Sequence, residues 1–435
     1  MRFKFAVLIA LITWISGHAQ SDEISLERAL FNLPDMAFKK LSKPGDPYLQ
    51  YALTIRQPLD HQHPEKGYYG QQVMLTHKDF NGPTVMNISG YSMPKGKNEI
   101  VNMLHANELS IEYRYFGTSR PDSLLWEYLT YDQVMSDLHR INLLFRNVYQ
   151  GKWVSTGISR GGQTAIIYKY YYPEDVDIAV PYVAPMINGL EDKRIYDFLD
   201  TVGSDDCRNR IAAFQVYLLK HEKEILEKLK WYSKGRRLEF SYLGTPGKAF
   251  EYTVLEYPFS FWQVSNKTCE EIPIGKPVDE HIDHLLDVSD LESFADKSMR
   301  DFQVHYYQAV MEGGYYGYDA RPLKKYLHYI EPDNPAGSFP PKSVTYKSFD
   351  SSFMDKIFLW LDDQGNDFIY IYGGRDTWSA CRVNVTSKVN SRLFMVPGAN
   401  HFAARVKNMP PAMKQDLTEA FRKIANLTID LETLK

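Results

Sequence analysis

The chain contains 435 residues, of which 44% are hydrophobic and 24% are charged, and this composition excludes a disordered protein. Its 50 Lys and Arg residues nearly balance its 54 Asp and Glu residues, so the formal charge is −4 and no nucleic-acid partner is expected. At about 100–200 residues per domain, the length predicts two or three domains.

The N-terminus is typical of a secretory signal peptide. Arg2 and Lys4 precede an apolar run over residues 5–16, and a small-residue cleavage site follows. The run is shorter than the roughly 20 residues that a membrane span requires. We therefore expect residues 1–19 to be removed and the protein to be secreted or periplasmic, without a stable membrane anchor. The alternative, an uncleaved anchor, is disfavoured by the polar residues 21–23 that follow at once.

The next zone, residues 20–190, alternates short β-type runs with helical stretches such as 131–145. The runs cover residues 49–55, 72–75, 84–88, 109–113 and 153–156. Alternation of this kind predicts an α/β fold, in which a parallel sheet carries helices on its faces.

A Gly-x-Ser-x-Gly motif, from Gly157 to Gly161, follows the last of these strands and precedes a helical stretch that ends before Pro173. Between a strand and a helix this motif is a nucleophile elbow, a strained turn that exposes the serine hydroxyl. Side chains at the two glycine positions would clash in such a turn. Ser159 is therefore the candidate nucleophile. The alternative is a glycine-rich turn with an idle serine.

Acyl transfer also needs donors for the oxyanion. The backbone N–H of Arg160, directly after Ser159, is the first candidate. The second donor is expected in the loop after an early strand, and the run 84–88 leads into Ser89-Gly90-Tyr91. We therefore nominate the backbone N–H of Tyr91, with an ordinary turn as the alternative.

The middle zone, residues 191–354, has a different pattern. Residues 205–234 contain no Gly or Pro, and apolar side chains such as Ile211 and Leu218 recur at helical spacing. A second helical stretch covers residues 290–311. These stretches predict a mainly helical insertion.

Two of the three cysteines, Cys207 and Cys269, lie in this zone, whereas Cys381 lies far along the chain. In an oxidising compartment we expect a Cys207–Cys269 disulfide that leaves Cys381 unpaired. The alternative is three buried free thiols. Because the cysteines are too few and too scattered for a zinc site and no P-loop is present, we expect neither metal ion nor cofactor.

The last zone, residues 355–435, returns to the strand–helix pattern. Its elements are β-type runs at 368–372 and 393–396 and a helix at 411–424. Asp376 follows the first run and His401 follows the second. Both therefore lie at the carboxyl ends of strands, in the chain order Ser, Asp, His that accompanies a nucleophile elbow. The sequence predicts a triad of Ser159, Asp376 and His401.

Several segments resemble the S37 serine peptidases, a family of secreted tripeptidyl aminopeptidases. The similar segments are residues 157–165, 172–177, 182–185 and 112–121. Arg160 stands where lysine is usual, and Tyr113 stands where histidine is usual. Residues 57–61 and 307–312 also resemble the related S28 group, the prolyl carboxypeptidases and dipeptidyl peptidase II.

The resemblance implies an α/β-hydrolase fold with an inserted helical cap and a Ser, Asp, His triad on the residues already identified. It also implies peptide or small protein substrates with a free N-terminus. Two departures leave the catalytic groups in place: Gly374 replaces a common acidic residue, and Thr377 replaces a usual proline. Competing hypotheses are an esterase or lipase with the same triad, and a binding protein without activity.

An exopeptidase must recognise a free amine, and a buried carboxylate can do so by pairing with the ammonium group. Glu312 is the candidate, because it is a lone acid among tyrosines and glycines within residues 308–316. A structural acid that accepts backbone N–H groups is the alternative. Elsewhere, Glu112 and Arg114 are expected to form a structural ion pair, and His281 and His284 to lie on a solvated helix end.

Overall fold

The computed structural model describes residues 22–43, 46–94, 96, 98–331, 335–347 and 349–434. The predicted signal peptide, residues 1–19, lies outside these ranges. Within them, none of the helices combines the length and apolar character that a membrane crossing requires.

The described strands form one nine-stranded sheet with the order β1-β2-β3-β5-β4-β6-β7-β8-β9. They are β1 Met36–Lys40, β2 Leu49–Pro58, β3 Tyr68–His77, β4 Thr84–Ile88, β5 Asn107–Ile111, β6 Trp153–Ile158, β7 Ile178–Tyr182, β8 Ile369–Gly373 and β9 Arg392–Val396. Strands β4 to β9 are parallel, as predicted. The prediction was wrong for β2 and β3: β2 pairs antiparallel with β1 and with β3, and β3 also pairs antiparallel with β5. Short connections, which allow antiparallel pairing, join β1 to β2 and β2 to β3.

Helices cover both faces of the sheet. They are a helix over residues 22–31, α2 Glu99–Met103, α3 Tyr131–Arg146, α4 Arg160–Tyr171, α12 Ser352–Gln364 and α13 Pro411–Ala425. Side chains of alternate residues in β8 point to opposite faces of the sheet. Tyr370 and Tyr372 pack in the apolar cluster that includes α3, α4 and α12, and Ile369 and Ile371 pack in the cluster of α2 and α13. This strand order with an elbow after β6 is the α/β-hydrolase fold.

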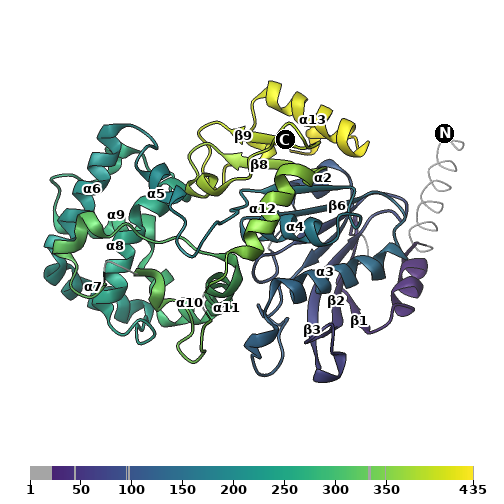
Figure 1. Cartoon of the computed structure of the whole chain (residues 1–435), viewed down its shortest axis with the longest axis horizontal. Helices are drawn as coiled ribbons and strands as arrows, with labels where there is room; N and C mark the ends of the chain where they lie inside the picture. The colour runs from purple at the N-terminus through teal and green to yellow at the C-terminus, as the bar shows by residue number, and fades with distance from the viewer. Residues whose placement is uncertain are drawn as a thin grey trace, which may run out of the picture.

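Between β7 and β8 the chain forms the helical segment, which lies beside the sheet (Figure 1). Its helices are α5 Arg194–Leu199, α6 Asp205–Lys220, α7 Glu222–Arg236, α8 Pro246–Gln263, α9 Val278–Ser289, α10 Asp296–Asp301 and α11 Gln303–Gln308. It has an apolar cluster of its own. However, Val304 and Tyr307 of α11 pack in the cluster of the sheet, so the two parts share this element.

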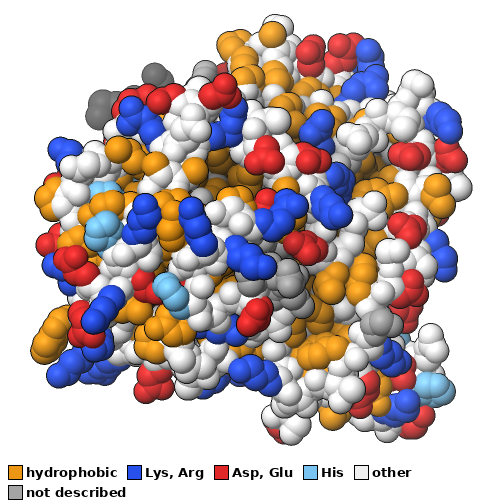
Figure 2. All heavy atoms as spheres, turned by 60° about the vertical axis from the view of Figure 1, so that its left-hand side comes forward, with side chains coloured by type: hydrophobic (Ala, Val, Ile, Leu, Met, Phe, Trp, Pro, Cys, Tyr) orange, Lys and Arg blue, Asp and Glu red, His pale blue; other side chains and the backbone are white. Residues whose placement is uncertain are grey.

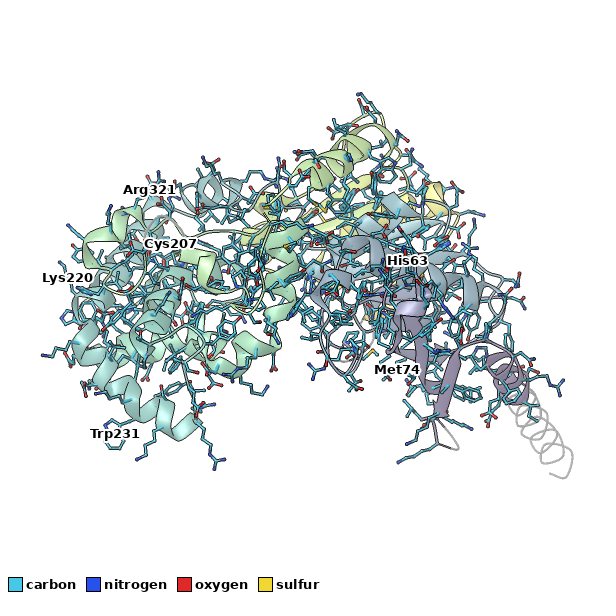
Figure 3. The ribbon with its side chains drawn as sticks, turned by 60° about the horizontal axis from the view of Figure 1, so that its bottom comes forward. His63, Met74, Cys207, Lys220, Trp231 and Arg321 are labelled. Atoms are coloured by element: carbon cyan, nitrogen blue, oxygen red, sulfur yellow. A yellow bond between two sulfur atoms is a disulfide. The ribbon has the colours of Figure 1, made fainter. Side chains whose placement is uncertain are left out.

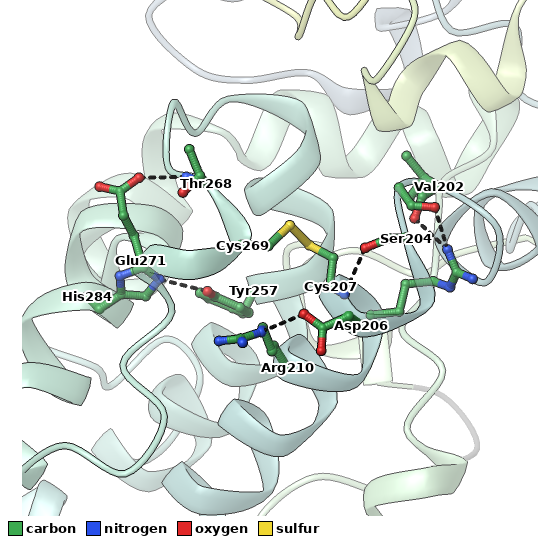
Figure 4. Close-up of a disulfide and its surroundings, with 12 residues drawn as sticks. Val202, Ser204, Asp206, Cys207, Arg210, Tyr257, Thr268, Cys269, Glu271 and His284 are labelled. Carbon is green, nitrogen blue, oxygen red and sulfur yellow. Dashed lines mark hydrogen bonds and ion pairs between the residues drawn. A yellow bond between two sulfur atoms is a disulfide. The ribbon is translucent and has the colours of Figure 1, made fainter.

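The predicted disulfide between Cys207 and Cys269 is present, and Cys381 is a buried free thiol. The bridge joins the first turn of α6 to the short 3₁₀ helix Cys269–Glu271 that follows α8 (Figure 4). It therefore fastens the interior of the helical segment rather than its junction with the sheet.

The outer face of the helical segment carries both signs of charge. Figure 2 shows Lys and Arg side chains interspersed with Asp and Glu over this face, with hydrophobic side chains between them. Figure 3 shows Trp231 projecting from α7, and its side chain is 74% exposed.

Candidate active site

Ser159 occupies the tight turn between β6 and α4. Its φ is 58°, a left-handed conformation that non-glycine residues seldom adopt. A Cβ atom on Gly157 would lie 2.3 Å from the carbonyl carbon of Gly161, and one on Gly161 would lie 2.3 Å from the carbonyl oxygen of Ile88. The turn can therefore form only with glycine at both positions, which agrees with the nucleophile elbow predicted from the motif.

Asp376 and His401 meet after β8 and β9. The Nδ1 atom of His401 lies 2.8 Å from Oδ2 of Asp376, and both side chains are buried. The other carboxylate oxygen, Oδ1, accepts the backbone N–H of Trp378 at 3.1 Å. The carboxylate is thus held on both oxygens and fixes the orientation of the imidazole.

Backbone contacts fasten the two loops to each other. The N–H of Gly374 donates to the carbonyl of Val396 at 2.9 Å, and the N–H of Arg375 donates to that of Ala399 at 3.0 Å. The N–H of His401 donates to the carbonyl of Gln263 at 2.8 Å. The last residue of α8 therefore helps to position the histidine, so the helical segment is part of the site.

The strand register relates Ser159 to this pair. A row of paired residues crosses β6, β7, β8 and β9 through Ile158, Tyr182, Ile371 and Phe394. Ser159, Asp376 and His401 all follow this row, so they emerge at the same edge of the sheet. In the described part of the chain the Ser159 hydroxyl has no hydrogen-bond partner. Contacts between nucleophile and base are commonly loose in free enzymes and tighten when substrate binds.

The N–H of Arg160 is the first amide of α4, where a helix presents N–H groups without helical partners. The loop after β4 packs directly against it, because a Cβ on Gly90 would lie 2.6 Å from that of Arg160. The N–H of Tyr91, however, donates to Oγ of Ser89 at 3.1 Å. The predicted loop is therefore in place, but Tyr91 does not offer a free donor. Among the described residues the N–H of Gly90 has no partner.

The side chain of Arg160 has a role that the sequence did not indicate. It is buried, donates to the carbonyl of Gly90 at 2.8 Å and to Oε1 of Gln308 at 2.5 Å, and lies 4.2 Å from the ring centre of Tyr113. Within the described ranges it forms no ion pair with a carboxylate. It thus ties α11 and the loop after β4 to the elbow.

Glu312 lies in the π-helical turn Ala309–Gly313, directly after α11 and one turn from Gln308. Its Oε2 accepts the backbone N–H of Tyr131, at the start of α3, at 2.8 Å. Burial raises the pKa of Glu312 to about 7, although the N–H of Tyr131 and the side chain of Gln308 act in the opposite direction. Glu312 therefore accepts one backbone N–H, as the alternative of a structural acid predicts. Its pKa nevertheless lies near neutral pH.

A cavity of about 730 Å³ adjoins this turn in the helical segment. Its lining includes Tyr306, Ala309, Tyr315, Tyr316 and Phe339. Aromatic walls with phenolic groups suit a ligand that is partly apolar and forms hydrogen bonds. The residues that line this cavity do not include Ser159, Asp376, His401 or Glu312.

Two predictions outside the triad were wrong. Arg114 pairs with Asp137 rather than Glu112: its Nε and Nη2 atoms lie 2.6 and 2.8 Å from the carboxylate oxygens, and both side chains are fully buried. His281 and His284 are buried rather than solvated. Both rings contact Phe214, but their other partners differ: His281 stacks on Tyr217, and His284 bonds to the hydroxyl of Tyr257 at 2.8 Å.

Comparisons with known proteins agree with the resemblance noted in the sequence. The model of the family described as PS-10 peptidase S37 matches residues 19–428. The prolyl tri/tetrapeptidyl aminopeptidase of Streptomyces mobaraensis is 31% identical over 409 residues, which are 91% of this chain and 85% of that protein.

Solved structures are more distant. The proline iminopeptidase of Mycobacterium smegmatis is 13% identical with a TM-score of 0.41, covering 80% of this chain and 92% of that chain. The protein VinJ is 12% identical with a TM-score of 0.41, covering 89% of this chain and 99% of that chain. The strand order and the elbow after β6 define the fold of this chain.

Proposed function

Because this chain belongs to the S37 family of PS-10 peptidases, we propose that it is a secreted serine exopeptidase that releases short peptides, chiefly tripeptides, from free N-termini. The observation that carries the proposal is the His401–Asp376 pair at the same sheet edge as Ser159 on its strained elbow. These are the nucleophile, base and orienting carboxylate that acyl transfer requires.

The proposed reaction proceeds through an acyl-enzyme. Ser159 Oγ attacks the scissile carbonyl carbon while Nε2 of His401 accepts the hydroxyl proton, and Asp376 holds the Nδ1 side of the ring. The N–H of Arg160 stabilises the negative oxygen of the tetrahedral intermediate. The C–N bond then breaks, and the leaving amine takes the proton from His401. Water, activated by the same histidine, releases the short peptide from Ser159.

Glu312 is the proposed partner of the substrate ammonium group. It is linked to the elbow through its own helical turn, since Gln308 contacts Arg160, which directly follows Ser159. A substrate bound by its terminal amine at Glu312 would place a peptide bond a short, fixed number of residues away at Ser159. Such an arrangement accounts for exopeptidase cleavage at a set length.

Peptide length can be tested with amide substrates that differ only in the number of residues before the scissile bond. The relative from Streptomyces mobaraensis is named for tri- and tetrapeptides and for prolyl residues, so the panel should contain di-, tri- and tetrapeptides ending in Pro or Ala. Each should be tested with a free and an acetylated N-terminus. We expect the highest kcat/KM with free tripeptides and negligible cleavage of the acetylated forms.

The same panel separates the alternatives. Turnover of simple esters without cleavage of any peptide amide would contradict the peptidase proposal and favour an esterase. Equal cleavage of free and acetylated peptides would contradict the exopeptidase proposal while leaving a peptidase in place. Glu312→Gln should reduce the preference for free over acetylated peptides if Glu312 binds the substrate amine. Glu127→Gln, at an exposed glutamate, is its matched control.

A further inference from the structure

Three potential metal ligands from three separate elements meet in the helical segment, outside the candidate active site. Glu222 begins α7, Glu251 lies within α8, and His328 follows the 3₁₀ helix Arg321–Tyr326. One ligand atom from each lies within 4.8 Å of the other two. Oε2 of Glu222 is 2.7 Å from Nδ1 of His328, which is 4.0 Å from Oε1 of Glu251.

The two carboxylates of this cluster are buried without enough positive charge nearby to balance them. The side chains of Glu222 and Glu251 are 9% and 0% exposed, and neither forms an ion pair with Lys or Arg in the described part of the chain. Glu251 accepts the backbone N–H groups of His328, Tyr329 and Ile330. Those N–H groups satisfy its hydrogen bonds, but they add no full positive charge.

Glu222 has fewer hydrogen-bond partners than Glu251. The imidazole of His328 is its side-chain partner, and its other oxygen, Oε1, is buried without a partner among the described residues. Burial raises the pKa of both carboxyl groups, and the proximity of Glu251 raises that of Glu222 further. A buried oxygen without a partner is costly unless a proton or a metal ion occupies the site.

We propose that Glu222, Glu251 and His328 bind one divalent zinc ion that has a structural role. One imidazole nitrogen and two carboxylate oxygens are a donor set that Zn²⁺ accepts, whereas Ca²⁺ and Mg²⁺ prefer oxygen ligands alone. The side chain of His328 is 62% exposed, so solvent can reach the site and water can complete a tetrahedral coordination. The ion would cross-link α7, α8 and the segment after residue 326.

Small adjustments suffice for coordination. Bonds of about 2.0–2.1 Å at tetrahedral angles place ligand atoms roughly 3.3 Å apart. Nδ1 of His328 would therefore move about 0.6 Å away from Oε2 of Glu222, now at 2.7 Å, and about 0.7 Å toward Oε1 of Glu251, now at 4.0 Å. The exposed ring of His328 can move by this amount. A hydrogen bond between His328 and Glu222 without metal is the competing explanation, and it predicts a stability that zinc does not change.

The test uses the mature chain without an affinity tag, freed of metal by chelation and dialysis. Zinc is then titrated by calorimetry, retained metal is counted by mass spectrometry, and Tm is measured with and without zinc. We expect one zinc per chain and a Tm that zinc raises. Co²⁺ should bind in place of zinc, and its visible absorption spectrum should be that of a four-coordinate cobalt site.

Variants make the assignment specific. His328→Ala and Glu222→Gln should each weaken zinc binding at least tenfold and remove the rise in Tm. His63→Ala is the matched control, because His63 is a similarly exposed histidine next to a glutamate, Glu65. Figure 3 shows His63 over the sheet, far from Lys220, which precedes Glu222 by two residues.

Either of two results overturns the proposal. One is that the wild-type chain neither retains zinc after purification nor binds added zinc, and that zinc does not change its Tm. The other is zinc binding that His328→Ala leaves unchanged.

Discussion

The orientation of His401 depends on one buried carboxylate. Asp376→Asn should lower kcat about 10⁴-fold with little change in KM, because an amide favours the wrong tautomer of the imidazole. Steady-state kinetics on a tripeptide amide measure the effect, and circular dichroism checks the fold. A loss of less than tenfold would exclude Asp376 as the orienting group.

Glu312 should make substrate recognition pH-dependent. Since its pKa is raised to about 7, it is ionised at pH 8 and largely protonated at pH 5. Only the ionised form pairs with an ammonium group, and a charged hydrogen bond of this kind is worth about 10–100-fold. The ratio of kcat/KM between wild type and Glu312→Gln should therefore be about 10–100 at pH 8 and approach 1 at pH 5. A ratio independent of pH would contradict the role.

A rise in pH that favours substrate binding by Glu312 should lower the stability of the folded chain. The pKa of Glu312 is higher in the folded than in the unfolded chain, so its contribution is present below the ordinary carboxyl pKa and is lost as pH rises through about 7. Gln is neutral throughout. The Tm of Glu312→Gln relative to wild type should thus increase from pH 5 to pH 8 in thermal unfolding. A constant difference would show that Glu312 does not ionise in this range.

Among single residues, the glycines of the elbow are strongly constrained by backbone chemistry. Ser159, Asp376 and His401 are predicted from a motif and from their position after strands. The structure pairs His401 with Asp376, and the catalytic role of the three residues stays a prediction. Tyr91 is predicted as an oxyanion donor from the position of its loop alone. The sequence does not show that its N–H donates to the Ser89 hydroxyl instead. Asp137 was missed because it contacts Arg114 across 23 residues of chain.

At the scale of elements, the elbow should tolerate no added methyl group. Gly161→Ala should lower the free energy of unfolding by about 1–3 kcal/mol or more and abolish activity, because its Cβ would lie 2.3 Å from a backbone oxygen of β4. Gly235→Ala is the control: nothing lies within 4 Å of its Cβ on the exposed face of α7, and it should stabilise by roughly 0.5–1 kcal/mol. Denaturant unfolding measures both. Equal effects would contradict the steric account.

Most strands of the sheet could be predicted, because β-type runs coincide with β2 to β6, β8 and β9. Strands β1 and β7 were missed. Strand β7 contains Pro181, and proline normally argues against an interior strand. The stretch 205–234 was predicted as continuous but breaks at His221 into α6 and α7. No Gly or Pro marks that break, so tertiary packing decides it.

For the molecule as a whole, the disulfide should stabilise the helical segment. It closes a separation of 62 residues, for which the chain-entropy model gives about 4 kcal/mol. The double variant Cys207→Ser, Cys269→Ser should lose about that amount in denaturant unfolding, and Cys381→Ser serves as the control for thiol loss. An unchanged unfolding midpoint in the double variant would contradict this role.

The strand–helix pattern of the sequence stops after residue 190 and resumes after 355, which predicts an inserted helical segment. The structure has helices α5 to α11 between β7 and β8, and the division into domains stays a prediction. Contacts between distant elements were not predictable. The three residues of the proposed zinc site include pairs 77 and 106 residues apart, and no local pattern marks them. Likewise, the pairing of Val304 and Tyr307 with the core of the sheet appears only in the folded chain.

The central claim is that Ser159 is a nucleophile activated by His401 and Asp376. Labelling the mature protein with a fluorophosphonate and locating the adduct by mass spectrometry tests it most directly. We predict one adduct per chain on Ser159, none in Ser159→Ala, and much slower labelling in Asp376→Asn. A folded wild-type protein that is not labelled, or that is labelled on another residue, would contradict the account.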